Sequence, residues 1–259
     1  DGETPLHVAA RHEYVEVAQL LVDNKANIEA KDKDGETPLH KATFPDGFEV
    51  AKLLIDNKAN IEAKDKDGET PLSTAAFWNG FEVAKLLIDN KANIEAKDKN
   101  GKTPLHVAAF CDHFEVAKLL IDNKANIEAK DKNGKTPLHV AAFWNGFEVA
   151  KLLIDNKANI EAEDKHGQTP LHFAAINDSI EIAKLLIDNK ANIEAKDKDG
   201  DSPLHETIYN NSIEVAKLLI ENGANIEAKG QYERTPLDLA KENLGREEFI
   251  SLLKKHGAT

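Results

Sequence analysis

One repeat period runs through this chain and restricts what it can fold into. A turn dipeptide that ends in glycine recurs every 33 residues without slippage, at Gly2, Gly35, Gly68, Gly101, Gly134, Gly167 and Gly200. Self-similarity at a period of about 20 to 50 residues is typical of stacked structural repeats. We therefore expect a single repeat domain over residues 1–259, with repeats at 1–33, 34–66, 67–99, 100–132, 133–165, 166–198 and 199–231 and a shorter final repeat at 232–259.

Each repeat is predicted to contain two short helices. In the second repeat, Thr37 suits a helix N-cap and Pro38 suits the first helical position, where its missing N–H has no consequence. The later run Glu49–Ile55 places apolar side chains at helical spacing. Two short helices in 33 residues cannot bury their apolar faces alone, so neighbouring repeats must stack into a solenoid.

Leucines mark the expected core. Every repeat has one leucine directly after its proline and a Leu-Leu pair in its second helix, for instance Leu39, Leu53 and Leu54. At about 2 kcal/mol for each buried leucine, three leucines contribute about 6 kcal/mol per repeat before chain entropy is subtracted. That contribution is ample for a stack of repeats and marginal for one repeat alone.

The recurring motif resembles that of a known family. Thr-Pro-Leu-His begins at Thr4, Thr37, Thr103, Thr136 and Thr169, with Ala-Ala and Glu-Val-Ala-Lys-Leu-Leu segments further along the repeat. In period and motif the chain resembles the ankyrin repeat family over essentially its whole length. The resemblance implies an all-α solenoid of eight helix-turn-helix units with β-hairpin-like fingers along one edge. It also implies that the chain binds proteins through the finger tips and the concave groove.

The residue after the second helix departs from the family pattern. Glycine is usual there, but this chain has glycine only at Gly223 and Gly257 and lysine at Lys25, Lys58, Lys91, Lys124, Lys157 and Lys190. A lysine held in the left-handed conformation costs about 1 kcal/mol relative to glycine. We expect these lysines to adopt that conformation unless the preceding asparagine takes part of the strain.

The two end repeats differ from each other. In the last repeat, Lys254 replaces the aliphatic residue at the end of the second helix, which gives the polar outer face that a capping repeat needs. The first repeat keeps Leu20, Leu21 and Val22. We therefore expect either a capping repeat before residue 1 or an exposed apolar end that is tolerated.

The sequence offers no recognisable chemistry. Six of the ten histidines occupy the same repeat position, which favours a structural role, and these are His7, His40, His106, His139, His172 and His205. Successive members lie about 10 Å apart, too far to share a zinc ion. Phosphate-binding loops, nucleophile elbows and zinc-finger spacings do not occur. We therefore predict no enzymatic activity, no cofactor and no metal.

Charge and cysteine content narrow the partners and the compartment. A net charge of −13 argues against nucleic acid or an anionic membrane and is compatible with a basic or neutral protein. No apolar run approaches the roughly 18 residues of a membrane span. The single cysteine, Cys111, fits a reducing compartment. We expect a cytoplasmic monomer, with an effector directed into a host cell as the alternative.

Positions that vary between repeats are the candidates for partner binding. Positions eight, eleven and twelve share one face of the first helix. Position eight accepts Lys41, Thr74 and Glu206, so we expect this face to reach water. Position eleven carries Phe44, Phe77, Phe110, Phe143 and Tyr209, and position twelve carries Trp78 and Trp144. Tryptophan and tyrosine are enriched in interface hot spots, so these aromatics predict the binding face.

Two further observations bear on that face. Finger-tip residues change sign along the chain, from Glu3, Glu36 and Glu69 to Lys102 and Lys135, which gives a partner a possible register. The alternative for the aromatic residues is ordinary packing between neighbouring first helices. The favoured function is a protein-binding scaffold or adaptor. A targeting domain of a larger enzyme and a designed consensus-like array remain as alternatives.

Overall fold

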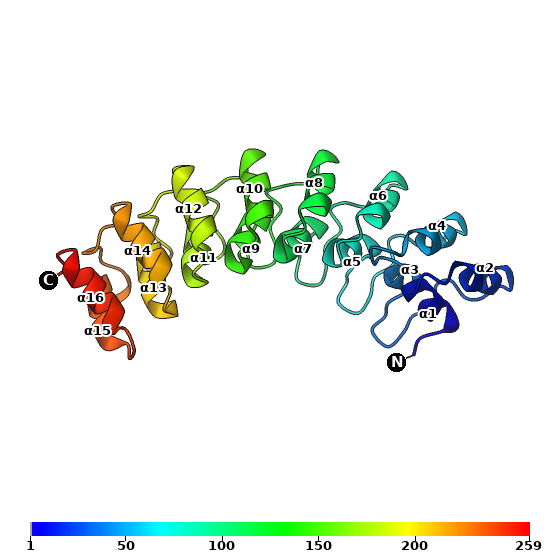
Figure 1. The fold of residues 1–259 in the computed structure, drawn as a ribbon, viewed down its shortest axis with the longest axis horizontal. Coiled ribbons are helices and arrows are strands. Elements are labelled where there is room, and N and C mark those ends of the chain that lie inside the picture. The colour runs from blue at the N-terminus through cyan, green and yellow to red at the C-terminus, as the bar shows by residue number, and fades with distance from the viewer. Residues whose placement is uncertain (1) are drawn as a thin grey trace. The chain divides into compact units, whose positions relative to one another are not determined.

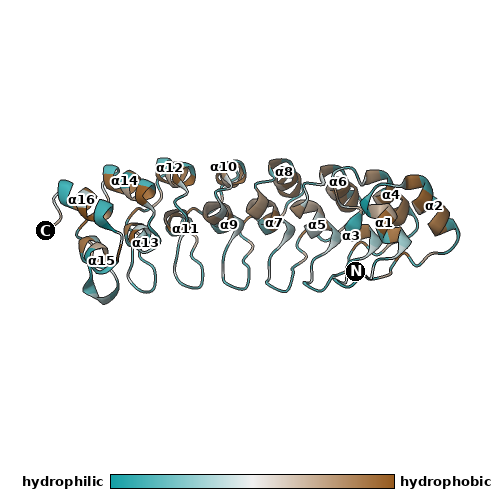
Figure 2. Ribbon diagram, turned by 60° about the horizontal axis from the view of Figure 1, so that its bottom comes forward, coloured by the Kyte–Doolittle hydropathy of each residue, from teal (hydrophilic) through white to brown (hydrophobic). Residues whose placement is uncertain are grey.

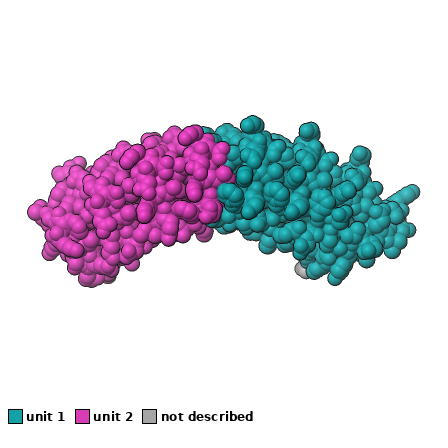
Figure 3. Space-filling model, turned by 45° about the horizontal axis from the view of Figure 1, so that its top comes forward, with its two compact units in different colours: residues 1–132 teal, residues 133–259 magenta. Residues whose placement is uncertain are grey.

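A computed structural model describes residues 2–259 of the chain. The chain divides into two compact units, unit 1 up to Lys132 and unit 2 from Asn133 onward, and Figure 3 colours them separately. The division falls between the fourth and fifth repeats. We describe each unit by itself.

Each repeat forms the two helices that its sequence predicts, as Figure 1 shows. Unit 1 contains α1 (Pro5–Arg11), α2 (Val15–Asp23), α3 (Pro38–Lys41), α4 (Phe48–Asp56), α5 (Pro71–Phe77), α6 (Phe81–Asp89), α7 (Pro104–Cys111) and α8 (Phe114–Asp122). Unit 2 contains α9 (Pro137–Trp144), α10 (Phe147–Asp155), α11 (Pro170–Ile176), α12 (Ile180–Asp188), α13 (Pro203–Asn210), α14 (Ile213–Glu221), a 3-10 turn at Gln231–Glu233, α15 (Pro236–Glu242) and α16 (Glu247–Lys255). Residues 2–259 form no strand.

Local sequence explains where the first helices begin and end. Thr103 has extended backbone angles, with φ −91° and ψ 166°, and Pro104 follows it as the first residue of α7. Helix α3 is the shortest of the series because Pro45 has no N–H to donate to the carbonyl of Lys41. Most other repeats carry Trp, Cys or Asn at this position, and their first helices run to seven or eight residues.

The leucine core is confirmed in part. Leu39 and Leu54 are fully buried, whereas Leu53, the first member of its pair, is partly exposed. The first repeat is more open. Val17 is 47% exposed, but its equivalent in the second repeat, Val50, is 0% exposed. Val50 is covered because α4 packs against α2, while no described residue covers the corresponding face of α2.

Loops between the helix pairs form the fingers, which lie along one edge of each unit in Figure 2. Asp65 N–H donates to the Glu69 carbonyl (3.1 Å) within one finger, and Lys99 N–H donates to the Asp67 carbonyl (2.8 Å) of the finger before it. Gly68 has φ +81°, and a Cβ there would lie 3.0 Å from the Lys99 nitrogen. Glycine is therefore required both for the turn and for the close approach of the next finger.

The lysines after the second helices have the strained conformation that the sequence predicts. Their φ values lie between +63° and +72°, at Lys25, Lys58, Lys91, Lys124, Lys157 and Lys190. The preceding asparagines keep negative φ, for example −89° at Asn57. The strain therefore falls on the lysines and not on the asparagines.

Helix α16 closes unit 2. The side chains of Phe249 and Leu253 in this helix are buried, and that of Lys254 is exposed. The Arg246 guanidinium donates to the carbonyls of Ile208 (2.6 Å) and Tyr209 (3.1 Å) and so ties the last repeat to α13. The role of the last repeat as a cap stays a prediction, to which the exposed Lys254 is suited.

Candidate protein-binding grooves

In unit 1 the predicted aromatic residues lie together on α5, α7 and the segment after α3. Phe77 is 39% exposed and Trp78 is 44% exposed, while Phe44 and Phe110 are partly buried. The Trp78 ring lies 4.7 Å from Phe44 and 4.9 Å from Phe77, measured between centroids. Phe77 and Phe110 are stacked, with centroids 6.5 Å apart and planes 17° from parallel.

Unit 2 presents a second aromatic group. Trp144 is 53% exposed and packs edge-on against the partly buried Phe143, with centroids 5.2 Å apart. Phe143 in turn contacts Phe173 at 6.1 Å, and Phe173 is almost completely buried. Tyr209 is 36% exposed. Phe173 was not among the predicted residues, although it is the one aromatic residue at position eight of the repeats.

The expected exposure is wrong for position eight from the second repeat onward, although Val8 in the first repeat is 40% exposed and the rest of the face reaches water at positions eleven and twelve. Lys41, Thr74, Val107 and Glu206 are all buried, between 5% and 9% exposed. A charged residue at a variable position does not prove solvent contact, because other polar side chains of the protein can replace water. Lys41 and Glu206 are accommodated in this way.

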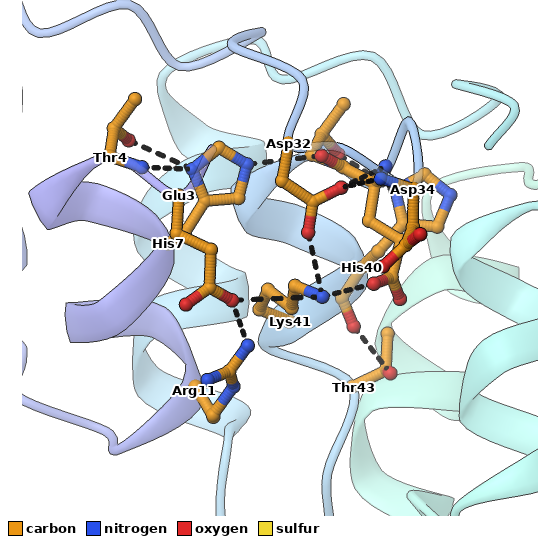
Figure 4. Close-up of polar contacts among 11 residues, drawn as sticks. Glu3, Thr4, His7, Arg11, Asp32, Asp34, His40, Lys41 and Thr43 are labelled. Carbon is orange, nitrogen blue, oxygen red and sulfur yellow. Dashed lines mark hydrogen bonds and ion pairs between the residues drawn. The ribbon is translucent and has the colours of Figure 1, made fainter. Parts of the chain in front are cut away.

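Lys41 binds carboxylates of the first and second repeats. Its ammonium lies 2.9 Å from an Asp32 oxygen and 3.8 Å from Glu3, and it also bonds to Glu36. Figure 4 shows Lys41 reaching from α3 between Glu3 and Asp32, with Arg11 on the far side of Glu3. We call this site, lined by Glu3, Arg11, Asp32, Lys33, Asp34 and Lys41, the lysine-paired groove; its volume is about 330 Å³.

The ion pairs of the lysine-paired groove determine how its groups titrate. Burial by itself would raise the pKa of Asp32, but the Lys41 ammonium and the backbone N–H groups of Glu36 and Asp34 outweigh burial and lower the pKa. The Asp32, Asp34 and Glu36 carboxylates have oxygens within 4.8 Å of one another. The Lys41 ammonium bonds to two of these three groups, so it already compensates their charge.

Two repeats further along, the equivalent groove has different contents. Its volume is about 390 Å³, and we call it the open groove; it is lined by Asp67, Glu69, Phe77, Asp98, Asn100, Lys102, Val107 and Phe110. The open groove brings together three predicted binding residues, Phe77, Phe110 and Lys102. The Lys102 ammonium lies 5.8 Å from the centroid of the Phe110 ring. Lys102 is partly buried and belongs to the lining of the groove.

The acidic lining of the open groove was not predicted as a site. Asp67, Asp98 and Asn100 belong to the near-constant finger sequence, so comparing repeats gave no signal for them. Glu69 was noted only as a finger-tip charge. Within residues 2–259 its carboxylate has no ion pair within 4 Å, although Lys102 attracts it from a greater distance.

Glu69 is the most perturbed group of the open groove. Burial raises its pKa to about 7, and repulsion from Asp65, Asp98 and Asp67 adds to that rise, while Lys102 opposes it. The carboxylate is therefore close to half ionised at neutral pH. The attraction of Lys102 is therefore smaller than the combined effect of burial and the neighbouring carboxylates.

In unit 2 the corresponding positions hold other charges. Lys135 places its ammonium 4.5 Å from the Phe173 centroid and 5.8 Å from the Phe143 centroid. Glu206 accepts a hydrogen bond from the Gln168 amide (2.8 Å) and a longer one from Asn210 (3.3 Å). Burial, followed by the charges of Asp197 and Asp201, raises the pKa of Glu206 to about 7.

The repeated histidines have the structural role that the sequence predicts. His139 Nδ1 accepts the Thr136 N–H (3.1 Å), and its Nε2 lies 3.0 Å from the carbonyl of Gln168 in the next repeat. An accepting Nδ1 requires the proton on Nε2, so the neutral imidazole joins two repeats. Burial lowers the pKa of His139 to about 4, which keeps the ring neutral. Burial also raises the pKa of the Cys111 thiol and keeps it protonated.

Comparison with known families agrees with the helix pairs. A family profile described as ankyrin repeats (3 copies) matches residues 1–65, 46–131, 125–197 and 189–259. The chain belongs to the ankyrin repeat family. Ankyrin repeats are in general protein–protein interaction modules and non-catalytic scaffolds. No match to a curated protein was found.

The helices of this ankyrin repeat protein are short. Among residues 2–259, none is long and apolar enough to cross a membrane.

Proposed function

We propose that this ankyrin repeat chain is a scaffold or adaptor that binds a protein through the aromatic residues at the ends of its first helices, together with the lysines beside them. In unit 1 the contact residues are Phe44, Phe77, Trp78, Phe110 and Lys102. In unit 2 they are Phe143, Trp144, Lys135 and Tyr209. The exposure of Trp78 (44%) and Trp144 (53%) carries the proposal, because both large rings remain open to solvent in the folded units.

Internal comparison supports a role in binding over a role in folding. At position twelve, other repeats replace tryptophan with Asn177 or Asn210 and still form complete first helices, α11 and α13. Exposed aromatic rings of this kind dominate binding energy at many interfaces, where truncation costs about 2 kcal/mol or more.

The test compares two double variants as bait for partner capture. Trp78→Ala with Trp144→Ala is expected to weaken capture at least about thirtyfold, which corresponds to about 2 kcal/mol. Its melting temperature should fall by no more than a few degrees, since both rings are largely exposed. The matched control, Lys85→Ala with Lys151→Ala, changes exposed residues of the second helices in the same two repeats.

The control is expected to capture the same protein as the unmodified chain, with equal affinity. Undiminished capture by the folded tryptophan double variant would overturn the proposed face.

A further inference from the structure

The lysine-paired groove and the open groove are the same site in two different repeats. Glu3 and Asp32 correspond to Glu69 and Asp98, and the place of Lys41 is taken by Val107. In the lysine-paired groove the Lys41 ammonium lies 2.9 Å from Asp32 and 3.8 Å from Glu3, and it also bonds to Glu36, whose place Lys102 takes in the open groove. The molecule itself therefore shows that this arrangement of carboxylates holds a lysine side chain.

The open groove retains these carboxylates without the lysine. Its lining contains three carboxylates and one ammonium, whereas the lysine-paired groove contains three carboxylates, two lysines and one arginine. At position eleven, Phe77 replaces Arg11, so a second internal cation is lost. The one ammonium present, on Lys102, lies over the Phe110 ring. The lining is thus negative by two charges when all its carboxylates are ionised.

The floor of the open groove suits the stem of a long cationic side chain. Phe77 and Phe110 are stacked 6.5 Å apart, and Val107 lies beside them in the same lining. Lysine and arginine bury their aliphatic stems on apolar surfaces and keep the charged head in a polar environment. Cations are also attracted to aromatic faces.

We propose that the open groove receives a lysine or arginine side chain of the protein partner, with its stem on Phe77 and Phe110 and its charged head between Glu69 and Asp98. This inference rests on the proposed function and adds the chemical class of the residue that is recognised. The partner's cation takes the place that Lys41 occupies two repeats earlier.

The proposal predicts a pH dependence. The charged groups that act on Glu69 are Asp65, Asp67, Asp98 and Lys102, and His40, which lies 3.3 Å from its carbonyl, is kept neutral because burial lowers the pKa of the ring. A cation favours ionised Glu69, whose pKa is about 7 in the free groove. Affinity for a cationic side chain should therefore rise about tenfold between pH 6 and pH 8.

The test uses three capped pentapeptides that differ only at the central residue of Gly-Ser-Xaa-Ser-Gly. Lysine and arginine peptides distinguish the two cations, and norleucine supplies the same stem without charge. Amide shifts of Glu69, Asn100 and Lys102 in NMR spectra of the full chain report binding. We expect saturable shifts with the lysine or arginine peptide at up to about 10 mM, and none with norleucine. Equal shifts with norleucine, or none with either cation, would overturn the proposal.

Two variants test whether the peptides bind in the open groove. Glu69→Gln removes one carboxylate and should abolish the tenfold rise with pH. Val107→Lys supplies the internal ammonium that Lys41 provides in the lysine-paired groove, and it should abolish peptide binding. Should Val107→Lys fail to fold, Glu69→Gln still decides the outcome, because an unchanged pH dependence contradicts the proposal.

The same variants separate this inference from the proposed function. If partner capture is weakened when Trp78 is replaced but is unchanged in Val107→Lys, only the cation site is rejected. If the cationic peptides bind but partner capture is unchanged when Trp78 and Trp144 are replaced, only the proposed function is rejected.

Discussion

The lysine-paired groove and the open groove are formed by equivalent repeat positions and differ at four side chains. Lys41 and Arg11 in the first become Val107 and Phe77 in the second, while Glu36 becomes Lys102 and Asp34 becomes Asn100. In the first groove the carboxylates are compensated inside the protein. In the second, Glu69 is left with a pKa of about 7. The difference shows that a repeat protein can use one position either to stabilise itself or to leave a charge for a partner.

The largest expected effect comes from breaking the lysine-paired groove. Lys41→Met leaves Asp32 and Glu36 without their cation, and loss of one member of a buried ion pair destabilises by about 3 kcal/mol. Because the folded pKa of Asp32 lies below 3.8, its contribution is present above that value and is lost as the pH falls. Urea denaturation should therefore show the deficit at pH 7, and a smaller one near pH 3.

Lys85→Met is the matched control, since Lys85 is exposed on α6 and should change stability by less than about 0.5 kcal/mol. Equal losses for the two variants would contradict the role of Lys41.

An effect of opposite sign is expected at the same position in unit 2, where Glu206 stands in place of lysine. Its folded pKa of about 7 exceeds the ordinary 4.5, so the native state loses stability as the pH rises through that interval. Glu206→Gln should remove this loss and stabilise the chain by about 2 kcal/mol at pH 8 relative to pH 5. Thermal unfolding at the two pH values measures the difference.

Glu214 is exposed on α14, and Glu214→Gln should show no such dependence on pH. A gain for Glu206→Gln that is the same at pH 5 and pH 8 would mean that ionisation is not its cause.

The smallest effect is expected from placing a lysine in the third repeat at the position that Lys41 occupies in the second. Thr74 occupies the equivalent position, five residues after Glu69, as Lys41 is five residues after Glu36. In Thr74→Lys the new ammonium should lower the pKa of Glu69 by about one unit from its value of about 7 and so add about 1 kcal/mol of stability at pH 8. Carboxyl NMR titration measures the pKa, and Thr74→Val is the uncharged control. A pKa that stays near 7 would show that the grooves are not interchangeable.

Much of the fold was predictable because its determinants are local. A capping threonine, or Ser202 in α13, and the proline after it begin each first helix within two residues, and the left-handed lysines lie two residues after the second helices. The histidine contacts recur at a fixed separation of 29 residues, so period and residue type together predicted them. The predicted exposure was wrong where a side chain contacts a residue that varies between repeats. Lys41 and Glu206 are buried because Glu3 and Gln168, each 38 residues earlier, reach them.

The sequence by itself determined the helix pairs, their core leucines and the aromatic positions, because these follow from a 33-residue period and from contacts between neighbours in the chain. Only the tertiary structure decided which charges are compensated. Charge compensation depends on how two successive fingers and a first helix are placed relative to one another. The energy of a buried charge depends on its distance from the groups around it. The near-identical finger sequences therefore produce a neutralised groove beside Lys41 and an acidic, aromatic groove beside Glu69.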